Sequence, residues 1–226
     1  MAKISIVGVG PGSPDYMTPI ARRTVQSAQL VIGAERALNL FRGDLKGETL
    51  KLTAKNMDEV LSHAVESARK GKKVALLSTG DPGFSGLLRT FLKATRGKEV
   101  ETEVVPGISS MQVCAARLLM SWDEARLFTF HDGVSPEKKK QLVDVVRKGT
   151  DVMLFPDPRC FAPSEIAKFL IAEGVAEGTP AVVCENLTLS NERLMSSVLK
   201  DVLGKSYESL CVMVISPSRQ QRGKKT

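Results

Sequence analysis

The chain has 226 residues and a net charge of +7, and its composition is 42% hydrophobic and 25% charged. This length suffices for a sizeable core in two α/β lobes, and no uninterrupted apolar stretch approaches the roughly 20 residues of a membrane helix. Because the N-terminal KISIVGVG has the pattern of a strand and lacks the features of a secretory signal, we expect a cytoplasmic protein without membrane contact.

Short apolar runs alternate with helical patterns along the first half, which is typical of an α/β fold with mostly parallel strands. Strands are expected at residues 4–10, 30–34, 73–80 and 99–107. The first helix should begin with Thr18 as its N-cap and Pro19 at its first position. Further helices are expected at residues 58–70, 84–94 and 108–120.

The pattern restarts in the second half, so we predict a second α/β lobe. Strands are expected at residues 125–133, 151–158, 181–188, 191–198 and 209–217, with helices at 137–148 and 163–173. The last three strands are short and close together, which favours antiparallel pairs. These patterns predict an N-terminal lobe over residues 1–118, a C-terminal lobe over 119–217 and a tail over 218–226.

The tail, SRQQRGKKT, carries four of the positive charges and is expected to be disordered. The remaining body is mildly basic, which suits an acidic small substrate. No basic strand rich in aromatic residues is present to stack bases, so nucleic acid is not the expected partner. The run EKKKQ at residues 137–141 is interpreted as the exposed face of a helix.

The four cysteines lie far apart without a CxxC pair, and three of them stand in apolar runs. They are Cys114, Cys160, Cys184 and Cys211, and we expect reduced thiols of a cytosolic protein. The only histidines are His63 and His131, and no HExxH motif or Cys/His cluster occurs. We therefore predict no metal site.

A glycine-rich loop, GVGPG at residues 8–12, follows the first predicted strand. A dinucleotide-binding fingerprint would need its third glycine where Ser13 stands, and Pro11 removes a backbone N–H that a pyrophosphate would use. The one GKS triplet, at residues 204–206, lacks the preceding glycine of a phosphate-binding loop. Taken alone, GVGPG could be a tight strand-to-helix turn.

Three more loops follow predicted strands: STGDPGFSG at 78–86, PGISS at 106–110 and FPDP at 155–158. The carboxyl ends of parallel strands meet at one edge of a sheet, so these loops predict one shared ligand site. Asp81 either caps the following helix or accepts a hydrogen bond from a ligand amine or hydroxyl group. Ser109 and Ser110 stand at a predicted helix N-terminus, which suits a carboxylate, although a plain cap is the alternative.

Taken together, these loops resemble one family. GVGPG, STGDPGFSG, VVPGISS, FHDG, FPDPRCFAPSEIAKFL and VCENLTLSNERL, in this order, are similar to the motifs of the tetrapyrrole methylases. These are C-methyltransferases that use S-adenosyl-L-methionine in cobalamin and sirohaem synthesis, with relatives that modify diphthamide or ribosomal RNA. The resemblance extends from about residue 4 to residue 217.

The resemblance implies a homodimer of two-lobed α/β subunits, with the active site in the cleft between the lobes. Carried over by motif, GVGPG with Pro11 would form the floor on the tetrapyrrole side and make room for the macrocycle. The residues implied to contact the methyl donor are Gly80, Asp81, Phe84, Ser109 and Ser110, with backbone near Phe155, Pro156 and Glu185.

Within the family, ENLTLSNERL and DPRCFAPSEIA resemble the members that methylate C5 of cobalt-precorrin-7, an anionic tetrapyrrole. C15 methylation and decarboxylation would then belong to a separate partner protein. HDG and FPDP depart from the usual family motifs at the loops that border the substrate. Another precorrin carbon, diphthamide or ribosomal RNA therefore remains an alternative acceptor, and a non-catalytic RNA-binding module is a further alternative.

The donor's sulfonium already activates its methyl group, so the protein mainly has to align the reactants and exclude water. A base must remove a proton if methylation leaves a cationic ring. The polar candidates are Asp81, His131 and Asp132. His131 could equally be a structural histidine at the end of an apolar strand.

Overall fold

The computed structural model describes residues 3–218 and divides the chain into two compact units, residues 1–110 and 111–226. The division falls a few residues before the predicted lobe boundary at 118/119, because most of helix α5 (Ser110–Arg117) belongs to the second unit. Within the predicted tail, Ser218 donates its backbone N–H and its hydroxyl to the Asp151 carboxylate. The rest of the tail, residues 219–226, lies outside the described residues.

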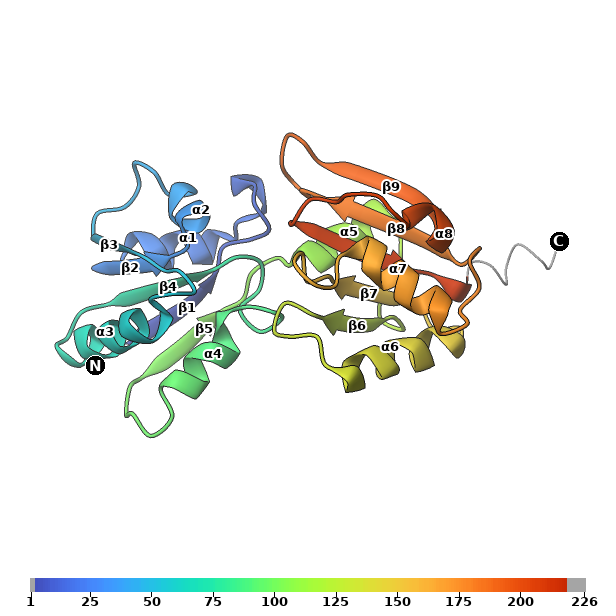
Figure 1. Ribbon diagram of the computed structural model, residues 1–226. Helices are drawn as coiled ribbons and strands as arrows, with labels where there is room; N and C mark the ends of the chain where they lie inside the picture. Colours follow the sequence, from blue (N-terminus) through green and yellow to red (C-terminus); the bar gives the residue numbers. More distant parts are fainter. Residues whose placement is uncertain (1–2, 219–226) are drawn as a thin grey trace. The chain divides into compact units, whose positions relative to one another are not determined.

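Within the described part of the first unit, five parallel strands form one sheet (Figure 1). In spatial order they are β3 (Glu48–Lys51), β2 (Leu30–Gly33), β4 (Val74–Ser78), β1 (Ile4–Gly8) and β5 (Thr102–Val105). The three central strands are buried along their whole length, as expected for a parallel sheet covered on both faces. The predicted α/β class with parallel strands is confirmed here.

Helices cover both faces of this sheet, and each face has its own hydrophobic cluster. On one face lie α1 (Pro19–Gln26) and α2 (Glu35–Asn39), and on the other α3 (Met57–Arg69) and α4 (Leu87–Ala94). The predicted start of α1 is confirmed, because the Thr18 hydroxyl accepts a hydrogen bond from the Ala21 N–H and Pro19 is the first helical residue. A short 3₁₀ helix, Pro14–Tyr16, precedes α1.

The second unit contains a mixed sheet of five strands among the residues described. In spatial order they are β6 (Arg126–Thr129), β7 (Val152–Phe155), β10 (Cys211–Ile215), β8 (Pro180–Glu185) and β9 (Arg193–Val198). β6 and β7 are parallel, whereas β10 is antiparallel to β7 and β8, and β9 is antiparallel to β8. The expected antiparallel pairs near the C-terminus are therefore confirmed.

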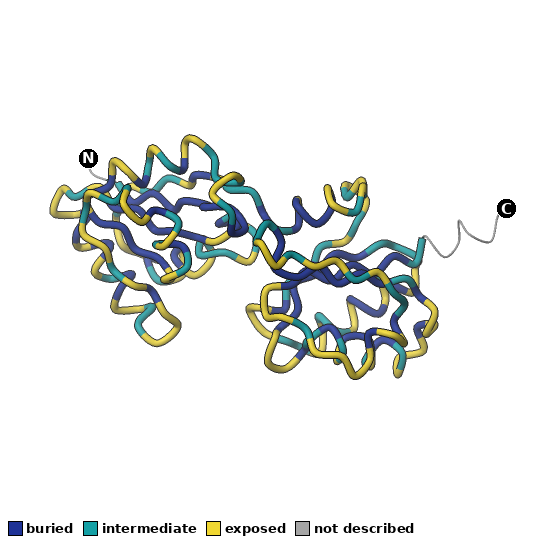
Figure 2. Tube along the Cα trace, turned by 90° about the horizontal axis from the view of Figure 1, so that it is seen from above, coloured by how far each residue is buried: buried dark blue, intermediate teal, exposed yellow. Residues whose placement is uncertain are grey.

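One large hydrophobic cluster joins one face of the second sheet to α6 (Pro136–Arg147), α7 (Pro163–Ala172) and the short α8 (Leu199–Val202). On the other face, α5 brings the Cys114 sulfur to 3.6 Å from that of Cys184 on β8. Three of the cysteine thiols are buried, whereas Cys160 is exposed, and all four are free. Figure 2 shows the buried strands as dark blue stretches through the middle of each unit.

The sequence patterns did not predict β3, α2 or α8. β3 is an edge strand with mostly exposed residues, and the two helices are only five and four residues long, so none of them shows an apolar periodicity. No helix within residues 3–218 is long and apolar enough to cross a membrane.

Three glycines hold the ends of β1, β4 and β5 in direct backbone contact. A Cβ atom built on Gly8 would lie 2.5 Å from the Gly107 nitrogen and 2.7 Å from the Gly80 oxygen, and one on Gly107 would lie 2.3 Å from the same oxygen. Gly10 has a φ of +84°, and its Cβ would lie 2.7 Å from the Tyr16 oxygen. The chain's own backbone thus fills the space that Gly8 and Gly10 leave, which corrects the expectation that a macrocycle fills it.

Gly8→Ala should lower the free energy of unfolding by about 3 kcal/mol, because the loop backbones must separate to admit the methyl group. Gly71→Ala is the control: its Cβ would meet nothing within 4 Å, and only its φ of +91° costs about 1 kcal/mol. Urea unfolding followed by circular dichroism measures both. A Gly8→Ala variant as stable as the natural chain would contradict this packing.

Candidate functional site

Three of the predicted loops meet at the carboxyl edge of the first sheet, because β4, β1 and β5 are adjacent and parallel. The Val9 N–H donates to the Ser78 oxygen at 3.0 Å, and the Gly80 N–H donates to the Gly10 oxygen at 2.8 Å. Loop 8–12 and loop 78–86 therefore continue to pair beyond the ends of their strands. The predicted convergence of the GVGPG, GDPG and PGISS loops is confirmed within this unit.

Asp81 connects two of these loops. Its Oδ1 accepts a hydrogen bond from the Gly83 N–H at 2.8 Å, and its Oδ2 accepts one from the Gly107 N–H at 3.1 Å. The alternative that Asp81 caps α4 is wrong, because Gly86 is the N-cap and the Leu87 N–H donates to the Ser78 hydroxyl. Asp81 is half-buried, and each of its oxygens keeps acceptor capacity for a ligand.

The other predicted site residues of the first unit, Pro11 of the tetrapyrrole side included, lie in the same loops. Pro11 and Gly80 are buried, Phe84 is half-buried, and Gly80 has a φ of +69°. Ser109 is 7% exposed, and Ser110 is the first residue of α5, so the two serines stand at a helix N-terminus as predicted, although the helix begins two residues later than expected. Ser85, beside Phe84, has a φ of +59°, which is unusual outside glycine and typical of strained functional loops. Nothing in the sequence indicated this strain.

In the second unit, the ends of β6 and β7 bring His131 and Phe155 together. Their rings stack with centroids 5.3 Å apart and planes 19° apart. Burial lowers the pKa of His131 below its ordinary value of 6.5, and the nearby Asp157 and Asp132 carboxylates and the Pro156 carbonyl only partly oppose this. The imidazole is therefore neutral at pH 7, so it can accept a proton.

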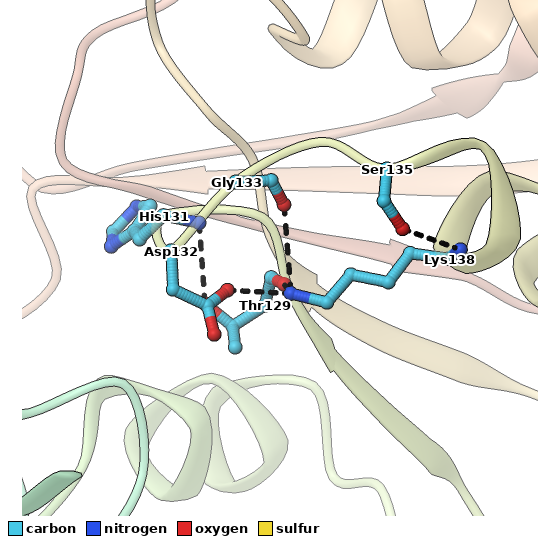
Figure 3. A network of polar contacts seen from close by, with 6 residues as sticks. All are labelled: Thr129, His131, Asp132, Gly133, Ser135 and Lys138. Atoms are coloured by element: carbon cyan, nitrogen blue, oxygen red, sulfur yellow. Dashed lines mark hydrogen bonds and ion pairs between the residues drawn. The ribbon is translucent and has the colours of Figure 1, made fainter.

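Asp132 is part of a polar network that Figure 3 shows. The Lys138 ammonium donates to Asp132 Oδ1 at 2.6 Å, to the Thr129 carbonyl at 3.1 Å and to the Gly133 carbonyl at 3.5 Å. The backbone N–H of His131 donates to the Thr129 hydroxyl at 3.3 Å. Lys138 thus ties the HDG loop, residues 131–133, to the first turn of α6.

Sequence reasoning missed Lys138, because EKKKQ has the composition of an ordinary solvated helix face. The position of Lys138 in the chain could have indicated its role. Ser135 caps α6 by accepting the backbone N–H of Lys138, which puts this lysine in the first turn, directly after the loop. From there its side chain reaches the Thr129 carbonyl at the end of β6 and the Asp132 carboxylate of the HDG loop (Figure 3).

Glu185 ends β8 and is 1% exposed. Its carboxylate forms an ion pair with Arg193 at 2.6 Å and accepts the Glu208 N–H at 2.8 Å. The Glu185 side chain is thus engaged inside the unit, and its backbone lies opposite Cys211 of β10 and Arg193 of β9. Beyond it, Asn186 and Thr188 have positive φ angles of 50° and 70°, a strained turn that the sequence did not reveal.

The predicted second-unit residues share one edge of their sheet. β8 runs parallel to β7, since β10 lies between them and is antiparallel to both. The edge at which β6, β7 and β8 end therefore carries His131, Phe155, Pro156 and Glu185. No group of three or more His, Cys, Asp or Glu side chains that could hold a metal ion occurs in the described part of the chain.

The model of one protein family, described as Tetrapyrrole (Corrin/Porphyrin) Methylases, matches residues 3–203. The chain is 40% identical over 213 residues to a Methanocaldococcus jannaschii protein named probable cobalt-precorrin-7 C(5)-methyltransferase, covering 93% of this chain and 96% of that protein. It is 32% identical over 192 residues to the Salmonella typhimurium cobalt-precorrin-7 C(5)-methyltransferase, covering 84% and 88%.

Among solved structures, that of the methyltransferase CobJ aligns with a TM-score of 0.82 at 19% identity, covering 96% of this chain and 94% of the other. This likeness shows a shared fold. The family model covers most of the chain and includes the GVGPG, GDPG, PGISS and HDG loops. The chain belongs to the tetrapyrrole (corrin/porphyrin) methylase family and is an S-adenosyl-L-methionine-dependent methyltransferase.

Proposed function

We propose that this methyltransferase acts in cobalamin synthesis and methylates C5 of cobalt-precorrin-7 to give cobalt-precorrin-8. The observation that carries the proposal is the 40% identity, over nearly the whole of both chains, to the Methanocaldococcus jannaschii relative whose name states this reaction. The Salmonella typhimurium relative, named for the same reaction, supports it at 32% identity.

The donor site proposed here consists of loops 8–12, 78–86 and 106–110. S-adenosyl-L-methionine supplies a methyl group that its sulfonium has already activated. The residues fit such a donor: the half-buried Asp81 carboxylate can accept hydroxyl or amine hydrogens, and Ser110 begins a helix whose positive N-terminal end suits a carboxylate. Gly80, with its positive φ, has no side chain to stand between these groups. The same loops contain Pro11, Phe84 and Ser109.

For the second unit we propose that His131 is the base and that the backbone of Phe155, Pro156 and Glu185 contacts the donor. Methylating a ring carbon that carries hydrogen leaves a proton to be removed. His131 is neutral at pH 7 and stacks on Phe155, so its proton-accepting nitrogen is available and its ring is oriented. Asp81 and Asp132 are less suited, because their carboxylates already hold backbone N–H groups and the Lys138 ammonium, respectively.

The family resemblance carries further proposals. We propose that the protein is a cytoplasmic homodimer without a protein-bound metal. A separate protein would then catalyse C15 methylation and decarboxylation. The mildly basic composition supports a substrate with several carboxylates.

Incubation with ¹³C-methyl-labelled S-adenosyl-L-methionine and a panel of cobalt-precorrins should place the label on C5 of cobalt-precorrin-7. Mass spectrometry detects the transfer, and carbon NMR locates the methyl group. Label on another ring carbon would contradict the C5 assignment. Donor binding without any labelled corrinoid would point to protein or RNA acceptors instead.

Asp81→Ala should weaken donor binding at least about tenfold, since the donor loses a charged acceptor and loops 78–86 and 106–110 lose their link. Asp58→Ala, which removes an exposed carboxylate from the first turn of α3, is the control and should leave the affinity unchanged. Titration calorimetry with S-adenosylhomocysteine measures both. Equal affinities for Asp81→Ala and the natural chain would show that Asp81 serves only the loop structure.

The turnover number should fall as the pH drops through the pKa of His131, which lies below 6.5, because protonation removes the base. Rates measured between pH 5 and pH 8 at saturating substrate test this. His131→Gln should lower turnover about 100-fold and abolish the acidic limb of the profile. An acidic limb that survives in His131→Gln would assign the proton transfer to another group.

A further inference from the structure

The HDG loop carries an acidic side chain where the proposed substrate is itself acidic. Left unpaired, the Asp132 carboxylate would repel the carboxylates of a tetrapyrrole and would attract a proton onto the neighbouring His131. The Lys138 ammonium, 2.6 Å away, neutralises it. Side chains of both residues are about one-third exposed, so this pairing is close to the solvent-accessible side of the loop.

The same ammonium also fixes the loop backbone. It donates to the Thr129 carbonyl at the end of β6 and to the Gly133 carbonyl at the end of the loop, so it spans the segment that contains His131 (Figure 3). A lysine with three donors can hold all three oxygens at once. Gly133 has a φ of +123°, which lets the backbone turn back toward the first turn of α6.

We propose that Lys138 is a positioning residue of the methyl transfer: it fixes the HDG loop so that His131 stays stacked on Phe155, and it cancels the Asp132 charge before an anionic substrate. This inference rests on the proposed function for the identity of the substrate. It assigns to one lysine of the KKK run a role that its neighbours Lys139 and Lys140 do not share. Lys139 instead lies 4.4 Å from the Phe161 ring centroid.

Lys138→Met should reduce kcat/KM for the corrinoid about 10- to 100-fold, through a higher KM and a lower kcat, while the affinity for S-adenosylhomocysteine stays unchanged. Lys138→Arg should recover most of the activity, because it keeps the charge and several donors. In the double variant Asp132→Asn/Lys138→Met, KM should return toward its natural value because no unpaired carboxylate remains. Lys140→Met, two residues along the same helix and therefore on another face, is the matched control.

A second readout needs neither donor nor corrinoid. NMR of the imidazole of His131, resolved from the only other histidine by His63→Gln, reports its pKa directly. The charged groups around it are Asp132, Lys138 and Asp157, the last of which also faces Arg159. The pKa should rise in Lys138→Met and return in the double variant. Lys138→Gln gives the same test if the Met variant fails to fold.

The inference is overturned if Lys138→Met matches Lys140→Met in both KM and the pKa of His131, since Lys138 would then be an ordinary solvated lysine. It is also overturned if Lys138→Met lowers activity without moving the His131 pKa and the double variant recovers nothing. If the natural chain methylates no corrinoid but the pKa of His131 depends on Lys138, the C5 assignment is refuted. The positioning of His131 by Lys138 is then still supported.

Discussion

The contact between the backbones of Gly8, Gly80 and Gly107 is the constraint on which the proposed donor site depends. Only glycine permits it, because any side chain at Gly8 or Gly107 would overlap a neighbouring backbone. It brings the ends of three parallel strands closer than side chains would allow. The loops that follow then share hydrogen bonds, and Asp81 can bond across to Gly107. The glycines therefore build the rigid support of the site, and the polar groups come from the residues between them.

Much of the fold, and the convergence of the glycine-rich loops, could be predicted from the sequence. Apolar runs alternating with capped helices indicated the α/β class, and Thr18 with Pro19 marked a helix start that the structure confirms. The order of the glycine-rich loops indicated a common edge, because parallel strands present their carboxyl ends together. The motifs resembled those of the family whose model matches residues 3–203. Local sequence patterns were sufficient to predict the structure wherever one segment determines its own conformation.

Contacts between distant segments could not be predicted in this way. Asp81 had the pattern of a helix cap, yet its Oδ2 accepts a hydrogen bond from Gly107, 26 residues away, through an interaction that depends on the order of strands in the sheet. Gly8 suggested room for a ligand, whereas it makes room for another loop. Lys138 resembled its neighbours in the KKK run, and only the fold shows that its side chain turns back onto the HDG loop.

Because their backbones are in contact, loops 8–12, 78–86 and 106–110 are proposed to form one donor-binding surface. Hydrogen exchange of the backbone amides, measured with and without S-adenosylhomocysteine, tests it most directly. Amides in all three loops, that of Gly107 included, should become protected together when the ligand binds. Protection of only one loop, or of none of them under saturating ligand, would contradict it.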